Sequence, residues 1–123
     1  MLRKLLLLSI AAAVCINSQE NNETFLLTIF LRHDQSKNVD QINDITGKTG
    51  FRDKFPPKGI DVVSWYVMMG IGQVVTLRVP PSRLREVNRI IETSAWGGYR
   101  TEFYPTYDYK PIWQSDWASG KSR

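Results

Sequence analysis

The strongest hydrophobic pattern in the chain lies in residues 61–80, DVVSWYVMMGIGQVVTLRVP. Two arms rich in β-branched and aromatic residues, which favour strands, flank a short turn that contains Gly70 and Gly72. Glycine adopts the positive φ angles that a tight chain reversal requires, so the pattern predicts a β-hairpin. Both arms are apolar on both faces. We therefore expect one face to meet helices and the other face to need a second cover.

Further elements are expected on both sides of this hairpin. Residues 24–32, TFLLTIFLR, are β-branched or apolar on both faces, which indicates a first strand. A first helix is expected to begin near Asn38, because Asn38 can cap it together with Gln41 three residues on. The apolar positions that then recur at helical spacing are Val39, Ile42 and Ile45. Gly47 and Gly50 are expected to interrupt this helix.

Phe51 and Phe55, four residues apart, predict another helical turn before two prolines. A second and clearer helix is expected after the hairpin. Its apolar stripe consists of Leu84, Val87, Ile90 and Ile91. Two glycines, Gly97 and Gly98, should end this helix, and residues 100–109, RTEFYPTYDY, predict a last strand.

The expected order of elements is strand, helix, strand, strand, helix, strand, which is the ferredoxin-like βαββαβ pattern of the α+β class. Right-handed crossovers then produce a four-stranded antiparallel sheet with two helices on one face. A chain of 123 residues allows one such domain. We assign the domain to residues 24–109 and a C-terminal tail to residues 110–123.

Residues 1–18 have the three parts of a secretory signal peptide. Arg3 and Lys4 supply the positive start, an apolar run follows, and small and polar residues end the segment. The apolar run is too short to span a bilayer. We expect cleavage after Ser18, which leaves a polar leader at residues 19–23, and export to the periplasm or to the outside of the cell.

Cys15 is the only cysteine, and the sequence AAAVC resembles a lipobox, which would place a lipid anchor on Cys15. Val14 argues against lipidation, because a lipobox has a small residue immediately before the cysteine. Cleavage near Ala13 or Cys15, or an uncleaved N-terminal anchor, is the alternative to cleavage after Ser18. Cleavage after Ser18 leaves no thiol, which excludes disulfides, thiolate nucleophiles and cysteine metal ligands from the mature chain.

The distribution of charge bears on the possible partners. The chain has 16 basic and 12 acidic residues and a formal net charge of +4, and Arg3 and Lys4 account for two of the positive charges. The other basic residues are interspersed with acidic ones and form no basic block. We therefore expect no nucleic-acid partner, no anionic membrane surface and no membrane span.

Alternation along the strands divides their side chains into two sets. The more apolar set, expected to face the helices, is Phe25, Leu27, Ile29, Leu31, Val63, Trp65, Val67, Val75, Leu77 and Val79. The opposite, mixed set is Leu26, Thr28, Phe30, Arg32, Val62, Ser64, Tyr66, Met68, Val74, Thr76, Arg78, Glu102 and Tyr104. The apolar members of the mixed set would form a patch of the kind that marks an interface. We expect a homodimer through this sheet face; the rival cover is the chain's own tail, with Trp113 and Trp117.

The order of elements, the Val79-Pro80 strand end that leads into the Leu84 helix, and the aromatic last strand resemble the dimeric α+β barrel superfamily. That superfamily includes muconolactone-isomerase-like and antibiotic-biosynthesis-monooxygenase-like proteins. The resemblance covers residues 24–109 and implies a dimer with a pocket for a small organic molecule. It transfers no catalytic residue.

His33, the only histidine, is the candidate catalytic residue, as a general base. Asp34 follows it directly, but neighbouring residues of an extended chain point to opposite faces, so a base role needs a partner from elsewhere. The structural alternative is a strand-end histidine that makes a hydrogen bond. One histidine and no mature cysteine predict no metal site, and no cofactor motif is present.

The candidate ligand-binding residues lie on the mixed face and are Arg32, Tyr66, Arg78, Glu102 and Tyr104. A buried charge is costly unless it is paired, so an inward arginine here needs Glu102, a partner subunit or an anionic ligand. In the alternative, both arginines lie at strand ends and reach solvent. Two functions follow. The protein is a dimer that binds a small apolar or aromatic molecule without turnover, or it is a cofactor-free enzyme of the isomerase or monooxygenase type that uses His33 and tyrosines.

Overall fold

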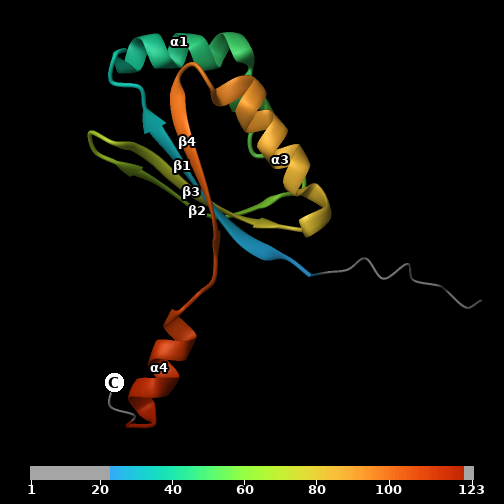
Figure 1. The fold of residues 1–123 in the computed structure, drawn as a ribbon, viewed down its shortest axis with the longest axis vertical. Coiled ribbons are helices and arrows are strands. Elements are labelled where there is room, and N and C mark those ends of the chain that lie inside the picture. The colour runs from blue at the N-terminus through green and yellow to red at the C-terminus, as the bar shows by residue number, and fades with distance from the viewer. Residues whose placement is uncertain (1–22, 121–123) are drawn as a thin grey trace, which may run out of the picture.

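The structure, a computed structural model, describes residues 23–120, so the predicted signal peptide lies outside the described residues. Within this range the chain is α+β and forms a four-stranded antiparallel sheet with four helices (Figure 1). No helix of residues 23–120 has both the length and the apolar composition that are needed to cross a membrane.

The strands are β1 (Phe25–His33), β2 (Asp61–Met68), β3 (Gly72–Val79) and β4 (Tyr99–Thr106). Their spatial order is β2-β3-β1-β4, and every neighbouring pair is antiparallel. The helices are α1 (Val39–Thr49), α2 (Phe51–Lys54), α3 (Leu84–Ile90) and α4 (Lys110–Ala118). The predicted hairpin is confirmed as β2 and β3, and β1 lies in the interior of the sheet between β3 and β4.

The start of α1 follows from its capping residues. The Asn38 side chain accepts a hydrogen bond from the backbone N–H of Gln41, and the Gln41 side chain accepts one from the backbone N–H of Asn38, as predicted. Gly50 ends the helix in the left-handed conformation, with a φ of 74°. Gly47 lies inside α1, so the expectation that it interrupts the helix is wrong.

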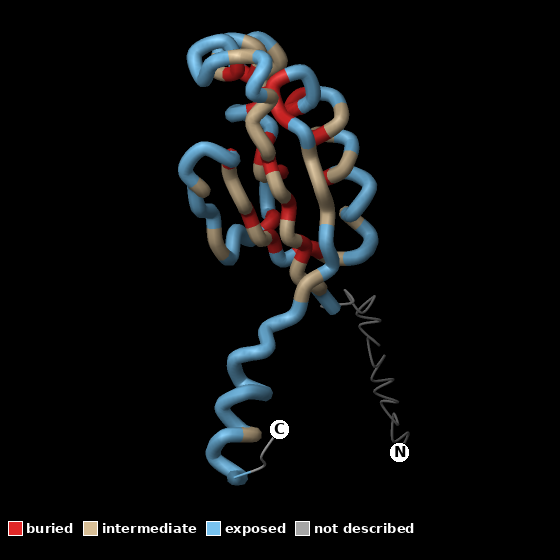
Figure 2. Tube along the Cα trace, turned by 60° about the vertical axis from the view of Figure 1, so that its left-hand side comes forward, coloured by how far each residue is buried: buried red, intermediate tan, exposed pale blue. Residues whose placement is uncertain are grey.

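Helices α1, α2 and α3 cover one face of the sheet, and one hydrophobic core lies between them and the strands (Figure 2). The central strands contribute Leu27, Ile29, Leu31, Val75, Leu77 and Val79. The helices and their connections contribute Ile42, Phe51, Phe55, Ile60, Val87, Ile91 and Ala95. All the core residues from β1 and β3 are at most 2% exposed, which confirms the alternation predicted for these two strands.

Strand β2 lies at an edge of the sheet, and none of its residues is buried. A β-bulge between Val62 and Ser64 shifts its register, so that Val62 pairs with Leu77 and Trp65 pairs with Val75. The pairing places Val62 on the helix side, and its assignment to the opposite face is wrong. The first arm of the hairpin therefore contributes less to the core than its apolar composition suggests.

Among residues 23–120, no helix packs on the second face of the sheet, which we call the open face. Its residues are Leu26, Thr28, Phe30, Arg32, Asp61, Ser64, Tyr66, Met68, Val74, Thr76, Arg78, Arg100, Glu102, Tyr104 and Thr106. Leu26, Phe30, Met68 and Val74 are half-buried by their neighbours in the sheet, and Tyr66 is 67% exposed. The open face is thus mixed, as predicted.

Helix α4 is an element that the hydrophobic pattern does not predict. It extends away from the sheet and from the other helices, and none of its residues is buried (Figures 1 and 2). Its two tryptophans, Trp113 and Trp117, meet edge to face, with ring centroids 6.2 Å apart. Helix α4 therefore does not cover the open face of its own chain.

The different burial of the two hairpin arms predicts different costs for the same substitution. Val75→Ala removes fully buried methyl groups and should lower the free energy of unfolding by about 2 kcal/mol. The matched control, Val67→Ala, removes the same atoms from a side chain that is 69% exposed and should change it by less than about 0.5 kcal/mol. Urea denaturation measures both values, and equal losses would contradict the edge position of β2.

Candidate functional site

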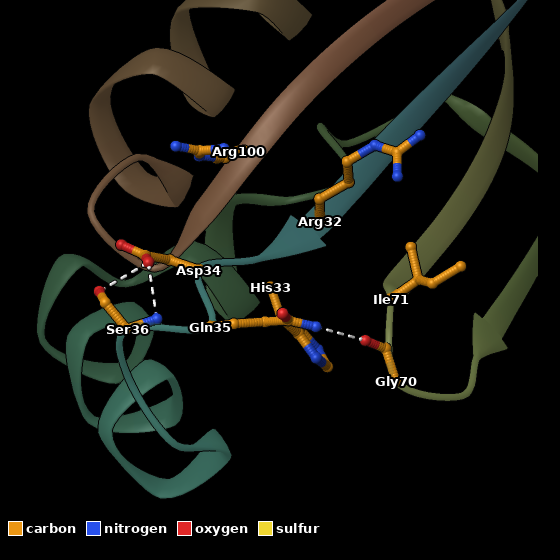
Figure 3. Close-up of a pocket in the computed structure, with 8 residues that line it drawn as sticks. All are labelled: Arg32, His33, Asp34, Gln35, Ser36, Gly70, Ile71 and Arg100. Atoms are coloured by element: carbon orange, nitrogen blue, oxygen red, sulfur yellow. Dashed lines mark hydrogen bonds between the residues drawn. The ribbon is translucent and has the colours of Figure 1, made fainter.

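A pocket of about 400 Å³ lies where β1, the β2–β3 turn and the start of β4 meet (Figure 3). Eight residues line this β1-end pocket: Arg32, His33, Asp34, Gln35, Ser36, Gly70, Ile71 and Arg100. They come from three segments that are far apart in the sequence and that the strand pairing brings together. The volume lies within the range of pockets that bind small molecules.

Gly72 allows the turn to approach the end of β1. It has a φ of 148°, and a Cβ atom at this position would lie 2.1 Å from the carbonyl oxygen of Leu31. Only glycine fits so close to another backbone. Two hydrogen bonds then hold the turn: the His33 backbone N–H donates to the Ile71 carbonyl at 2.8 Å, and the Gln35 amide donates to the Gly70 carbonyl at 2.9 Å (Figure 3).

Asp34 organises the chain directly after β1. Its carboxylate accepts hydrogen bonds from the Ser36 hydroxyl at 2.7 Å, from Lys37 Nζ at 2.9 Å and from the Ser36 backbone N–H at 3.1 Å. These donors, the Ser36 hydroxyl first, hold the pKa of the Asp34 carboxyl well below its usual range. Asp34 therefore stays ionised at neutral pH, and Lys37 compensates its charge.

His33, the predicted catalytic residue, lines the β1-end pocket. Its ring lies 5.9 Å from the ring of Tyr99, centroid to centroid, at an angle of 32°. Within residues 23–120 no hydrogen bond or ion pair joins the His33 imidazole to a carboxylate, and the Asp34 carboxylate is engaged by Ser36 and Lys37. Burial raises the pKa of the Tyr99 hydroxyl, which keeps this neighbour protonated at neutral pH.

The five predicted ligand-binding residues all lie on the open face, but they do not form one cluster. Arg32 donates to Glu102 at 3.3 Å near one end of the face. Arg78 lies at the other end, where its Nε is 3.9 Å from the Asp61 carboxylate. Tyr104 packs edge to face against Phe30 in between. Among these predicted residues only Arg32 also lines the β1-end pocket.

Three threonine hydroxyls meet on the open face, and sequence reasoning did not single them out. Thr28 Oγ1 lies 3.0 Å from Thr76 Oγ1 and 2.7 Å from Thr106 Oγ1, so a hydroxyl chain crosses β3, β1 and β4. The three hydroxyls meet only because of the register in which β3, β1 and β4 pair. No short sequence pattern indicates the register of β4. The hydroxyls give this mixed surface a hydrogen-bonded group that spans three strands.

Arg100 is a further residue of this region that the sequence did not indicate as a site residue. It is the direct cross-strand partner of Arg32, and its side chain therefore lies on the same face. Within the described part of the chain, Arg100 makes no ion pair. Its neighbour Arg32 forms an ion pair with Glu102, and the Arg32 Cζ atom lies 5.6 Å from the centroid of the Phe30 ring.

The close approach at Gly72 predicts a difference between the two glycines of the turn. In Gly70→Ala the new methyl group meets no atom within 4 Å. The substitution should lower the free energy of unfolding by about 1 kcal/mol, because alanine is strained in the left-handed backbone conformation of this residue. Gly72→Ala should cost at least about 3 kcal/mol, because the new methyl group must also displace the Leu31 carbonyl. Thermal or urea unfolding of the two variants tests this order, and a smaller loss for Gly72→Ala would be inconsistent with the packing of the turn.

Residues 23–120 contain no group of three or more His, Cys, Asp or Glu side chains arranged to hold a metal ion. No protein-family model, no curated protein and no solved structure matches the chain. The function of the β1-end pocket and of the open face must therefore follow from their own side chains.

Proposed function

We propose that the protein is exported and acts as a homodimer that binds a small apolar or aromatic molecule without chemical turnover. In this dimer the open faces of two ferredoxin-like sheets pack against each other, as in the dimeric α+β barrels that the sequence resembles. The ligand lies between the two faces. The observation that carries the proposal is an extended, partly apolar sheet face that no helix among residues 23–120 covers.

Two features of the structure support a second copy as the cover. Phe30 and Val74 are direct cross-strand partners, Met68 lies diagonally from Val74, and Leu26 lies on the same face beyond Thr28. Burying their apolar surface contributes about 25 cal/mol per Å². The rival cover, the tail, extends away from the sheet as helix α4. A two-fold dimer brings the same patch of both copies together, so one mixed face is sufficient to form the interface.

The polar groups of the open face are suited to orienting a ligand in such a dimer. The hydroxyl chain of Thr28, Thr76 and Thr106 crosses three strands of this face, and Tyr66 on β2 and Tyr104 on β4 lie on the same face. Binding sites for small molecules are mostly apolar and contain a few polar groups that fix the orientation. The charged residues Arg32, Glu102, Arg78 and Asp61 lie toward the ends, where water can reach them.

Charges introduced into the open face should abolish the dimer. Phe30→Glu and Val74→Glu should each yield monomers at micromolar concentration, because unpaired carboxylates would then be buried at the interface. Analytical ultracentrifugation measures the change, with circular dichroism as the check that the variants fold. The neutral aromatic probe 2-naphthol should bind to the wild type saturably and should lose this binding with Phe30→Glu.

Two controls separate the sheet face from other surfaces. Val39→Glu introduces the same charge at a 54% exposed position of α1 and should leave the dimer intact. Deletion of residues 110–123 should also leave it intact. A wild-type protein that sediments as a monomer at micromolar concentration is the result that overturns the proposal.

The position of His33 in the β1-end pocket supports a second candidate function, a cofactor-free enzyme of the isomerase or monooxygenase type with His33 as the base. Under this alternative, His33→Ala should lower turnover of any substrate found for the protein by at least about 100-fold. His33→Gln, which keeps a hydrogen-bonding group of similar reach, should be equally inactive. Full turnover by His33→Ala in a steady-state assay would exclude the base role.

A further inference from the structure

We propose that the β1-end pocket is a binding site for a small organic acid that carries one carboxylate. This site is made by residues of a single chain, and it does not depend on the proposed dimer. The charges that line the pocket, its rigid walls and the apolar side chain at its rim all suit such a ligand.

The first observation is a pair of like charges that the fold places side by side. Arg32 and Arg100 are directly opposite each other on β1 and β4, where Cβ atoms are about 5 Å apart. Like charges in this arrangement are destabilising. A bound anion beside either guanidinium group would reduce the repulsion, since arginine binds carboxylates through several N–H donors.

The second observation is that the protein itself compensates only one of these two charges. Glu102 accepts a hydrogen bond from Nε of Arg32, which leaves the terminal nitrogens of that side chain outside this contact. Asp34 also lines the pocket (Figure 3), but its ion pair with Lys37 neutralises it. Arg100 makes no ion pair within residues 23–120, so the described side chains around the pocket carry one uncompensated positive charge. This balance favours a monoanion over a dianion such as phosphate.

The third observation concerns the walls. The Gln35 amide is bonded to the Gly70 carbonyl, the His33 backbone is bonded to Ile71, and Gly72 packs against the Leu31 carbonyl. These contacts hold the pocket in shape before a ligand arrives, which lowers the entropic cost of binding.

The remaining wall of the pocket offers an apolar side chain and a ring, against which the uncharged part of an organic acid can pack. Figure 3 shows the Arg32 side chain extending from β1 toward the side of the pocket where Ile71 lies, with Arg100 on its other side. A carboxylate bound beside Arg32 therefore places the attached group near Ile71. The Ile71 side chain is exposed at the rim, and the His33 ring lies nearby. An apolar or aromatic body can therefore pack beside the charged end.

Benzoate is a suitable probe, and isothermal titration calorimetry in a low-chloride buffer at neutral pH tests the site. Benzoate should bind to the mature protein with one site per chain. Benzamide, which has the same shape but no charge, should bind at least about tenfold more weakly, as expected for the loss of one charge-assisted hydrogen bond. Inorganic phosphate should also bind more weakly than benzoate.

Arg100→Ala removes the uncompensated charge and should weaken benzoate binding by at least about tenfold. The variant should fold at least as stably as the wild type, because it also removes the repulsion with Arg32. The matched control is Arg85→Ala, an exposed arginine on α3 without an ion pair within the described residues, which should bind benzoate unchanged. Benzoate should shift the amide NMR signals of Ile71 and Arg100 and leave those of α3 in place.

Three results would overturn the proposal: no saturable binding of benzoate, equal binding by Arg100→Ala and the wild type, or tighter binding of phosphate than of benzoate. Sedimentation of Arg100→Ala in the same buffer reports the oligomeric state separately. A failure of this site therefore remains distinct from a failure of the sheet-face dimer.

Discussion

The burial of alternate residues along β1 is the constraint on which the rest of the structure depends. Leu27, Ile29 and Leu31 are almost completely shielded from water, and a slip of the strand by one residue would move all three to the open face. The register with β3 and β4 is therefore fixed by packing. The same register places Arg32 opposite Arg100 and carries His33 beyond the core to the pocket. The chemistry at the end of the strand is a consequence of the packing at its centre.

Features that depend on residues close together in the sequence were predictable. The hairpin, the cap of α1 and the stacked pair Phe51 and Phe55 follow from spacings of two to four residues. The bulge after Val62 has no such signal, because it is defined by the pairing of β2 with β3. Helix α4 also escaped prediction. It has no buried side chain, so no core-facing stripe marks it in the sequence.

The sequence indicated which residues the candidate site contains better than it indicated where they lie relative to one another. Alternation correctly assigns Arg32 and Arg78 to one face, but it says nothing of their separation, and the strand pairing places them at opposite ends. Arg32 and Arg100 lie opposite each other only because of the register in which β1 pairs with β4. Ile71 lines the β1-end pocket because the neighbouring Gly72 lets the turn approach β1 closely. These relations come from the three-dimensional arrangement, which a single sequence specifies only through the whole fold.

The two free edges of the sheet differ in how well they resist the addition of another strand. The β4 edge carries Arg100, Glu102 and Pro105, and charges and proline discourage pairing with a foreign strand. The β2 edge carries mostly apolar residues, and Asp61 at its start is its single charged side chain. There the bulge after Val62 breaks the row of outward N–H and C=O groups, and only the second half of the strand remains a regular template. Fibril growth or strand exchange between molecules would therefore begin beside residues 64–68.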